Sequence, residues 1–158
     1  MRVNDIEIRP LNSADLDLVS GLYHSIWHET HASLQDPRIA RSRDLAFFKS
    51  RLWHWQDCTR IACVDSEHVG LACWEGPVLE ALYIAPNFRS SGIGVKLLAA
   101  AEAEMRQSGA KELSLQCLCV NISGRRFYEN NGWRVLKTTA VPDGIHKDIV
   151  TQHWLMVK

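Results

Sequence analysis

The stretch NFRSSGIGVKLL at residues 87–98 joins a turn to the start of a helix. Arg89 and two serines precede a pair of glycines, Gly92 and Gly94, and apolar residues at helical spacing begin at Ile93. The first N–H groups of a helix have no partners within it, and the helix dipole adds partial positive charge there. Glycines let a bulky anion approach the backbone, and an arginine adds forked donors. The stretch therefore has the parts of a phosphate cradle.

Taken alone, this stretch fits two interpretations. It lacks the phosphate-binding signature G-x-x-x-x-G-K-[ST], because Lys96 does not directly follow the second glycine. It also lacks the dinucleotide signature G-x-G-x-x-G, since Leu97 stands where the third glycine belongs. A glycine-rich turn that only starts a helix therefore explains the stretch as well as a phosphate site does.

Strand and helix patterns alternate along the rest of the chain. Alternation and buried apolar runs predict strands at residues 6–9, 60–64, 68–74, 78–85, 112–120, 133–139 and 149–157. Helical spacing predicts helices at residues 16–27 with Ser13 as the N-cap, 42–55, 93–105 and 121–130. Pro37 marks a loop, and Gly109 ends the third helix. Such an order is typical of an α/β fold with a mixed sheet, and the length suits one domain over residues 1–158.

Charge and composition exclude several classes of protein. The 18 basic and 18 acidic residues balance, and no basic stripe marks a nucleic-acid surface. No apolar run reaches the ~18 residues that a membrane span needs. Five cysteines without C-x-x-C spacing predict neither a zinc site nor a redox motif, and they fit a reducing cytoplasm. We therefore expect a cytoplasmic protein that binds no nucleic acid, no membrane and no metal.

A second informative stretch follows the strand predicted at residues 112–120. It reads NISGRRFYENNGW, residues 121–133. Its characteristic positions are Asn121, Gly124, Phe127, Tyr128, Gly132 and Trp133. Together with R-x-x-G-x-G at residues 89–94, this order and spacing resembles the GNAT superfamily of acyl-CoA-dependent N-acyltransferases over residues 78–135. The chain departs from that pattern at Gly124, where alanine is usual, and at Trp133, where phenylalanine is usual. Neither departure removes a functional group.

The resemblance implies both a fold and a co-substrate. The fold is a mixed, mostly antiparallel sheet of about seven strands flanked by about four helices, with a parallel, splayed pair of strands at its centre. The co-substrate is acetyl-CoA, whose pyrophosphate would lie on backbone N–H groups at the start of the third helix. Its pantetheine arm would lie between the strands at residues 78–85 and 112–120. The residues implied for cofactor binding are Leu82, Tyr83, Ile84, Arg89, Ser90, Ser91, Gly92, Ile93, Gly94, Val95, Asn121 and Phe127.

The implied chemistry is direct attack of an amine on a thioester, and two protons must move. An alkylamine has a pKa of ~10.4, so a base must accept its proton at neutral pH. The resemblance makes Tyr128 the general acid for the leaving thiolate, because a phenol keeps its proton at neutral pH. The alternative for Tyr128 is a packed aromatic ring with a satisfied hydroxyl.

Glu80 is the candidate base, because it interrupts an otherwise apolar strand. Period-two alternation places Leu82 and Ile84 on the same face as Glu80. A solvent-exposed strand end is the alternative for Glu80, and a chain of water molecules is the alternative base. A covalent route through Cys117 or Cys119 has no base visibly paired with either thiol, and plain core packing is favoured for both.

Acceptor specificity is expected on the first two helices, the loop between them and the last hairpin. Trp27, His28 and His31 are candidate substrate-binding residues, although Trp27 also fits a core position. His24 shares a helix face with these histidines, which makes a metal site conceivable, but no second cluster completes a ligand set. The acidic lean of the first helix, at Asp15, Asp17 and Glu29, favours a cationic acceptor.

Two classes of function are compatible with the residues. The first is an enzyme that acetylates a primary amine of a small molecule or peptide. The second is a non-catalytic module of the same fold that senses acyl-CoA, and the presence of Tyr128 favours the enzyme. A homodimer is conceivable through exposed closing strands near Trp154.

Overall fold

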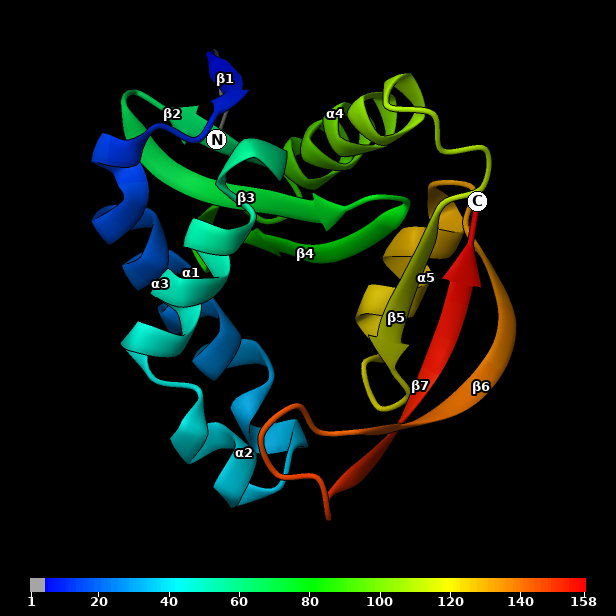
Figure 1. Ribbon diagram of the computed structural model, residues 1–158. Coiled ribbons are helices and arrows are strands. Elements are labelled where there is room, and N and C mark those ends of the chain that lie inside the picture. Colours follow the sequence, from blue (N-terminus) through cyan, green and yellow to red (C-terminus); the bar gives the residue numbers. More distant parts are fainter. Residues whose placement is uncertain (1–4) are drawn as a thin grey trace.

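Seven strands form one mixed sheet in the computed structural model, which describes residues 5–158 (Figure 1). The strands are β1 (Ile6–Pro10), β2 (Thr59–Val64), β3 (Glu67–Glu75), β4 (Val78–Ile84), β5 (Ser114–Leu118), β6 (Arg134–Pro142) and β7 (Val150–Val157). The helices are α1 (Leu16–Thr30), α2 (Pro37–Ser42), α3 (Leu45–His54), α4 (Ile93–Gln107) and α5 (Ile122–Asn130). Spatial order is β1-β2-β3-β4-β5-β7-β6, and every neighbouring pair except β4–β5 is antiparallel. The predicted mixed sheet with one parallel pair at its centre is confirmed.

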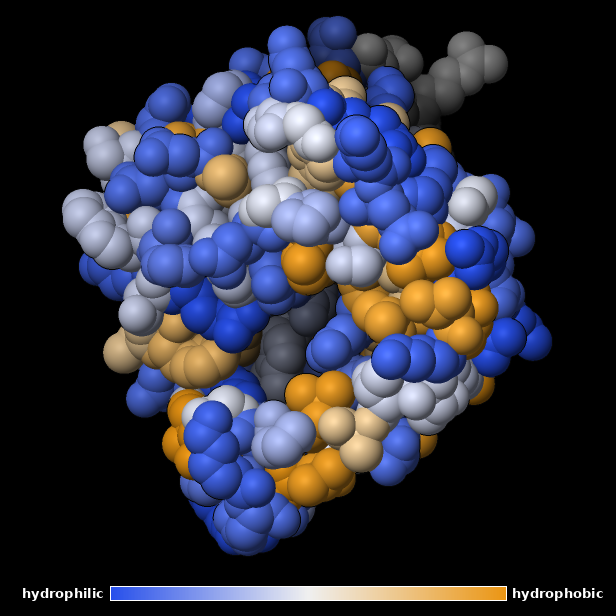
Figure 2. Space-filling model, turned by 45° about the vertical axis from the view of Figure 1, so that its right-hand side comes forward, coloured by the Kyte–Doolittle hydropathy of each residue, from blue (hydrophilic) through white to orange (hydrophobic). Residues whose placement is uncertain are grey.

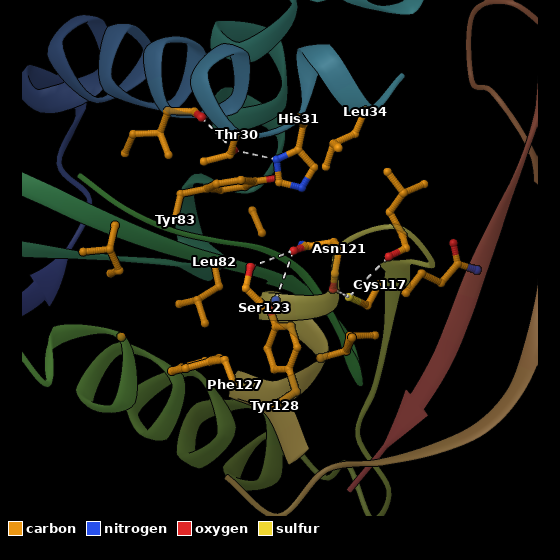
Figure 3. A pocket seen from close by; sticks show the side chains of 18 of the residues that line it. Thr30, His31, Leu34, Leu82, Tyr83, Cys117, Asn121, Ser123, Phe127 and Tyr128 are labelled. Atoms are coloured by element: carbon orange, nitrogen blue, oxygen red, sulfur yellow. Dashed lines mark hydrogen bonds between the residues drawn. The ribbon is translucent and has the colours of Figure 1, made fainter. Parts of the chain in front are cut away.

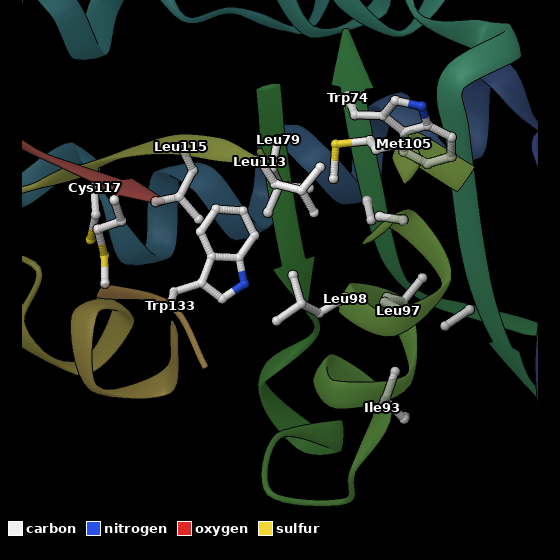
Figure 4. Packing of buried hydrophobic residues seen from close by; sticks show 14 of the residues in the cluster. Trp74, Leu79, Ile93, Leu97, Leu98, Met105, Leu113, Leu115, Cys117 and Trp133 are labelled. Carbon is white, nitrogen blue, oxygen red and sulfur yellow. The ribbon is translucent and has the colours of Figure 1, made fainter. Parts of the chain in front are cut away.

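Helices cover both faces of this sheet. On one face, α1 and α3 contribute Val19 and Phe48 to a core that includes Ile61 of β2. On the other face, α4 contributes Leu97 and Leu98 (Figure 4). Helix α5 lies on the α4 side, since its aromatic residues pack against that second core. Each helix therefore buries one apolar stripe against the sheet, as amphipathic helices do.

The surroundings of Trp133 accommodate a tryptophan at a position where phenylalanine is usual in the pattern described above. Its indole packs among the core leucines beside α4, and it is only 3% exposed (Figure 4). Its ring N–H donates a hydrogen bond to Glu102 Oε1 at 2.8 Å, so the polar atom that tryptophan adds over phenylalanine is satisfied.

Strands β4 and β5 splay apart after two residue pairs. They pair only at Val78 with Ser114 and at Leu79 with Leu115. Beyond Leu79, the β5-facing side of β4 has no strand partner, and a cleft opens between the two strands. The predicted splay is therefore present at the centre of the sheet.

A β-bulge in β4 overturns one prediction about Glu80. Cys73 pairs with Ala81 and the next residue, Trp74, pairs with Leu79, so Glu80 is the extra residue between them. The bulge places Leu79, not Glu80, with Leu82 and Ile84 in the core beside α4. Glu80 turns instead toward α3, where it lines a cavity with Arg51. Simple alternation was wrong here because the inserted residue reverses the side-chain direction.

Several element boundaries differ from the sequence prediction. Pro37 opens α2 rather than a loop, and the Asp36 side chain caps that helix by accepting from the Arg38 N–H at 2.8 Å. The helix predicted at residues 42–55 corresponds to α3 alone, which begins at Leu45, and α2 is an additional helix in the region predicted as a loop. The residue that precedes the first helical turn is Asn12, not Ser13, and a short 3-10 turn leads into α1.

The edges of the sheet are β1 and β6. Trp154 lies on β7, which pairs with β5 on one side and β6 on the other. The strand that carries Trp154 is therefore interior, and β6 is the closing strand with a free edge. No helix within residues 5–158 is long and apolar enough to cross a membrane.

Candidate active site

The fork between β4 and β5 opens into a cleft of about 660 Å³. Its walls come from both splayed strands, the end of α1, and the first turns of α4 and α5. The space-filling view shows a deep hollow bordered by hydrophobic residues (Figure 2). The cleft brings together ten of the residues predicted for the site, namely His31, Glu80, Leu82, Tyr83, Ile84, Arg89, Gly94, Asn121, Phe127 and Tyr128.

The turn into α4 presents unpaired backbone N–H groups at one end of this cleft. Gly92 is the N-cap with a φ of 85°, a left-handed conformation that favours glycine. The first amide of the helix to donate to a turn carbonyl is Lys96 N–H, to Gly92 O at 3.1 Å. The amides of the preceding helical residues lie ahead of that first hydrogen bond and are free for a ligand. The predicted cradle geometry is thus present.

Some residues of this turn can contribute only their backbone. Ile93 is fully buried in the core beside α4, so its side chain faces away from the cleft. Ser90, Ser91, Gly92 and Val95 do not line the cleft either, and the Ser91 hydroxyl donates to Phe88 O. A Cβ on Gly94 would lie 3.3 Å from the Phe127 ring, so this glycine allows α4 and α5 to approach each other.

Arg89 is engaged in an ion pair across the cleft. Its guanidinium donates to the Glu29 carboxylate of α1 at 2.7 and 3.2 Å, and its Nε donates to Ile84 O at 3.2 Å. The hydrogen bond from Arg89 lowers the pKa of Glu29. Both side chains line the cleft and remain partly exposed. The cation expected to meet phosphate is therefore held at the cleft by a protein carboxylate.

Asn121 fixes the start of α5. Its Oδ1 accepts the Gly124 N–H at 3.0 Å, as an N-cap does. A Cβ at Gly124 would lie 2.5 Å from Asn121 Nδ2, so the glycine leaves room for this orientation of the amide. The side chain of Asn121 lines the cleft (Figure 3).

Tyr128 lies on the α5 wall of the cleft (Figure 3). Its hydroxyl has no hydrogen-bond partner within residues 5–158 and is not sealed from solvent. Burial of the ring, with Tyr83 and Cys117 nearby, raises the pKa of Tyr128. The phenol therefore keeps its proton at neutral pH and can donate it into the cleft.

His31 lies across the cleft from Tyr128 (Figure 3). Its Nδ1 is 2.6 Å from Thr30 Oγ1, and that hydroxyl donates to Ile26 O at 2.7 Å. The Thr30 hydroxyl has a single proton and donates it to the Ile26 carbonyl. It can therefore only accept from His31, so Nδ1 must carry the hydrogen of the neutral ring. Burial lowers the pKa of His31, so the ring is neutral at pH 7 with an unprotonated Nε2.

Two other predicted substrate residues lie outside the cleft. Trp27 is 7% exposed in the core between α1 and the sheet, and its ring stacks on His31 at 6.0 Å. His28 Nε2 contacts Arg43 O at 2.6 Å and ties α1 to the end of α2. Both support the wall rather than line it. No cluster of three potential metal ligands occurs among residues 5–158.

A second cavity of about 400 Å³ lies next to the cleft. Its polar lining includes Arg51 of α3, Glu80 of β4, Gln116 of β5 and His153 of β7. Burial raises the pKa of Glu80, and the charge of Arg51 acts in the opposite direction. Burial also lowers the pKa of His153. Sequence analysis missed Arg51 and His153, because only the folded chain brings α3 and β7 to the same cavity.

The thiol of Cys117 lines the cleft but is not activated. Burial raises its pKa to about 11, so the thiol is protonated at neutral pH. Its weak hydrogen bonds go to the carbonyls of Leu118 and Asn121, and neither group is a base. Such a thiol is a poor nucleophile, which disfavours the covalent alternative.

The acidic residues of the first helical segment are engaged elsewhere. Asp15 is bound by Arg9 and contacts His68, and Asp17 pairs with Lys49. Glu29 alone of the three reaches the cleft, where it pairs with Arg89. The acidic lean therefore does not build a cationic-acceptor surface.

Comparisons with known proteins agree with this geometry. Residues 21–133 match the model of the acetyltransferase (GNAT) family. An uncharacterized N-acetyltransferase of Archaeoglobus fulgidus is 31% identical over 142 residues, covering 82% of this chain and 93% of the relative. The uncharacterized N-acetyltransferase YhfO of Bacillus subtilis is 28% identical over 138 residues, which cover 81% of this chain and 89% of YhfO. The crystal structure of PaiA N-acetyltransferase from Thermoplasma acidophilum, in complex with coenzyme A, superposes with a TM-score of 0.75 at 24% identity and covers 98% of each chain.

Proposed function

Because the chain belongs to the GNAT family of acetyltransferases, we propose that it moves an acetyl group from acetyl-CoA to a primary amine by direct attack. The observation that carries this proposal is the cleft between β4 and β5, with an open helix N-terminus at one end and the Tyr128 phenol on its wall. The coenzyme A bound to the PaiA N-acetyltransferase supports the choice of co-substrate.

The cofactor has a binding group for each of its parts. Backbone N–H groups of residues 90–95 bind the pyrophosphate, and Arg89 adds charge beside them. The pantetheine arm pairs with the free side of β4 around Leu82, Tyr83 and Ile84, where no strand supplies hydrogen bonds. Asn121 and Phe127, at the start of and within α5, contact the pantetheine arm from the other side of the cleft.

The acceptor nitrogen attacks the thioester carbonyl, so a C–N bond forms and the C–S bond breaks. Nitrogen loses two protons in all: the first passes from the ammonium group to the carboxylate of Glu80, directly or through a water molecule, and the second passes from the tetrahedral adduct to solvent. The leaving sulfur takes the phenol proton of Tyr128, which is recovered from solvent, and the products are an acetamide and the free thiol of coenzyme A. His31 contacts the acceptor from the opposite wall.

Calorimetry with acetyl-CoA, dephospho-CoA and free pantetheine tests the cofactor site. We expect tight binding of acetyl-CoA and much weaker binding of pantetheine, which lacks the pyrophosphate. Equal binding of pantetheine would mean that the α4 turn is not a phosphate cradle.

Tyr128→Phe tests the general acid. We expect acetyl-CoA affinity within about twofold of wild type and a turnover number at least about 100-fold lower in an amine screen for released thiol. Cofactor binding by the wild type without turnover on any amine would instead indicate a non-catalytic acyl-CoA sensor.

The wider properties of the protein are part of the same proposal. Residues 1–158 act as one acetyltransferase domain, and five unpaired cysteines fit a reducing cytoplasm. The free edge of β6 can pair with a second copy, giving a homodimer. Light scattering after size exclusion, with wild type and with Thr138→Pro on β6, measures that pairing. A wild-type protein with the mass of a monomer would exclude the homodimer.

A further inference from the structure

The second cavity adjoins the main cleft. It shares Leu79, Glu80, Leu115 and Gln116 with the main cleft. Leu79 and Leu115 form the last pair of the parallel ladder, so the two cavities meet at the fork of β4 and β5. A thioester that runs along β4 reaches this fork from one cavity, and a second substrate can reach it from the other.

Arg51 forms no salt bridge within residues 5–158, although it shares this cavity with Glu80 and its charge acts on that carboxylate. Within residues 5–158, six other arginines form salt bridges with aspartate or glutamate, namely Arg9, Arg38, Arg43, Arg60, Arg89 and Arg125. The guanidinium of Arg51 instead lies 4.3 Å from the ring centroid of Trp55 and 5.3 Å from that of Phe47. Its Nε is buried without a hydrogen-bond partner.

A half-buried cation with an unsatisfied hydrogen-bond donor lowers the stability of the fold unless an anion pairs with it and accepts that hydrogen bond. The aromatic rings of Trp55 and Phe47 hold the guanidinium in place on α3, so little entropy is lost when a ligand binds. Its planar fork of donors matches the two oxygens of a carboxylate. The missing partner of Arg51 therefore has the chemistry of an anionic group on a ligand.

Glu80 narrows the choice among anions. A phosphate dianion in this cavity would meet the negative charge of Glu80, which lines the same space. A ligand with a carboxylate at one end and an amine at the other complements both residues, because the amine can lie beside Glu80 at the fork.

We propose that the acceptor is a primary amine that also carries a carboxylate, as an amino acid does, with Arg51 binding the carboxylate. This assignment rests on the proposed acetyltransferase function. In the transfer, the amine nitrogen gains the acetyl carbon and loses a proton to Glu80, and the sulfur of coenzyme A leaves with the proton of Tyr128. The carboxylate itself is unchanged.

Matched acceptor pairs test the proposal with the full chain and acetyl-CoA. Each L-amino acid is compared with its primary amide, which has the same side chain and amine but no negative charge. For the preferred side chain, we expect kcat/KM for the acid to exceed that for the amide by at least about tenfold, the low end for a hydrogen bond to a charged group.

Substitution of Arg51 assigns that preference to a residue. Arg51→Met keeps an unbranched side chain over Trp55, and we expect it to remove the preference for the acid over the amide, with a larger loss of kcat/KM for the acid than for the amide. Arg51→Lys should retain part of the preference, since it keeps the charge but not the fork. Because both enzymes are measured on the same acid and amide, the difference in amine pKa between the two acceptors cancels.

Arg41→Met is the matched control, since Arg41 is exposed on α2 and lines neither cavity. We expect it to keep the wild-type preference. Equal use of acid and amide by the wild type, or equal losses on both acceptors in Arg51→Met, overturns the carboxylate assignment alone. Failure of the wild type to bind acetyl-CoA and to release thiol with any amine overturns the acetyltransferase proposal as well.

Discussion

In the proposed reaction, two side chains of the cleft are candidates to accept the proton of the amine. Glu80 lies at the junction of the two cavities, and burial raises its pKa above the ordinary value of a glutamate. His31 presents an unprotonated Nε2 from the opposite wall, and burial lowers its pKa. A base works only when deprotonated, so activity falls as the pH drops through its pKa. Comparing the pH profiles of variants at Glu80 and at His31 therefore separates the two residues.

We predict that Glu80→Gln lowers kcat/KM by about 100-fold or more and removes the acid limb of the profile. His31→Gln should raise KM for the acceptor and leave that limb in place. The measurement is kcat/KM against pH for wild type and both variants at saturating acetyl-CoA. An acid limb that survives in Glu80→Gln and disappears in His31→Gln would assign the base to His31 instead.

Helix α4 has a left-handed glycine at each end, which provides an internal control. Gly92 has a φ of 85° and Gly109 a φ of 105°, and a Cβ at either position would meet no atom within 4 Å. Alanine therefore adds similar backbone strain of about 1 kcal/mol at both ends. Only Gly92 lies at the proposed phosphate cradle.

We predict that Gly92→Ala and Gly109→Ala lower the melting temperature by similar amounts, while only Gly92→Ala weakens acetyl-CoA binding, by about tenfold. Gly92→Asp should abolish binding, because a carboxylate would face the pyrophosphate. Thermal unfolding and calorimetry on the same preparations provide both readouts. Equal loss of affinity in the two alanine variants would show that the effect is one of helix stability.

The Arg89–Glu29 pair couples α1 to the turn before α4. If Arg89 binds phosphate, that pair must open when acetyl-CoA arrives. We therefore predict that Glu29→Gln tightens acetyl-CoA binding about twofold to fivefold, and that Arg89→Gln weakens it about tenfold. Asp148→Asn, which breaks an exposed ion pair with Arg38, is the control and should leave the Kd for acetyl-CoA unchanged. Calorimetric Kd values at low ionic strength test this, and weaker binding in Glu29→Gln would contradict it.

Features that depend on short-range chemistry could be predicted from the sequence. The Gly92–Gly94 turn follows from a few adjacent residues, whereas the places of Asn121 and Tyr128 were implied by the resemblance of residues 121–133 to the GNAT pattern, and all three meet at one cleft. The order of strands and helices was predictable for the same reason, since each element carries its own periodicity.

Features that depend on pairing between distant segments could not be predicted. The bulge that turns Glu80 toward α3 is visible only in the register of β3 with β4. The position of Arg51 beside Glu80, without a salt bridge, depends on four elements that meet at the second cavity. The helix opened by Pro37 is a different case, because proline after an aspartate cap is a known start signal and could have been recognised.

Asp15 connects three parts of the whole molecule through one buried carboxylate. Arg9 of β1 donates to it at 2.7 and 2.9 Å, the Asn12 N–H before α1 donates at 2.9 Å, and His68 of β3 lies at 3.0 Å. The hydrogen bond from Arg9, foremost, lowers the pKa of Asp15 despite its burial. A lowered folded-state pKa stabilises the protein above the unfolded pKa of ~3.9, and that stability is lost as the pH falls further.

We predict that Asp15→Asn lowers the free energy of unfolding by about 2–4 kcal/mol at pH 7, because it leaves Arg9 without its counter-charge. The difference in unfolding free energy between wild type and variant should narrow steadily below about pH 4, where Asp15 takes up a proton in the unfolded chain but stays ionised in the folded protein. Asp17→Asn, two residues further along at the start of α1, is the control: Asp17 pairs with Lys49 while 81% exposed, so its substitution should have no measurable effect on the free energy of unfolding. Urea unfolding across the pH range measures all three proteins. A gap that stays constant down to pH 2 would mean that Asp15 contributes through packing and not through its charge.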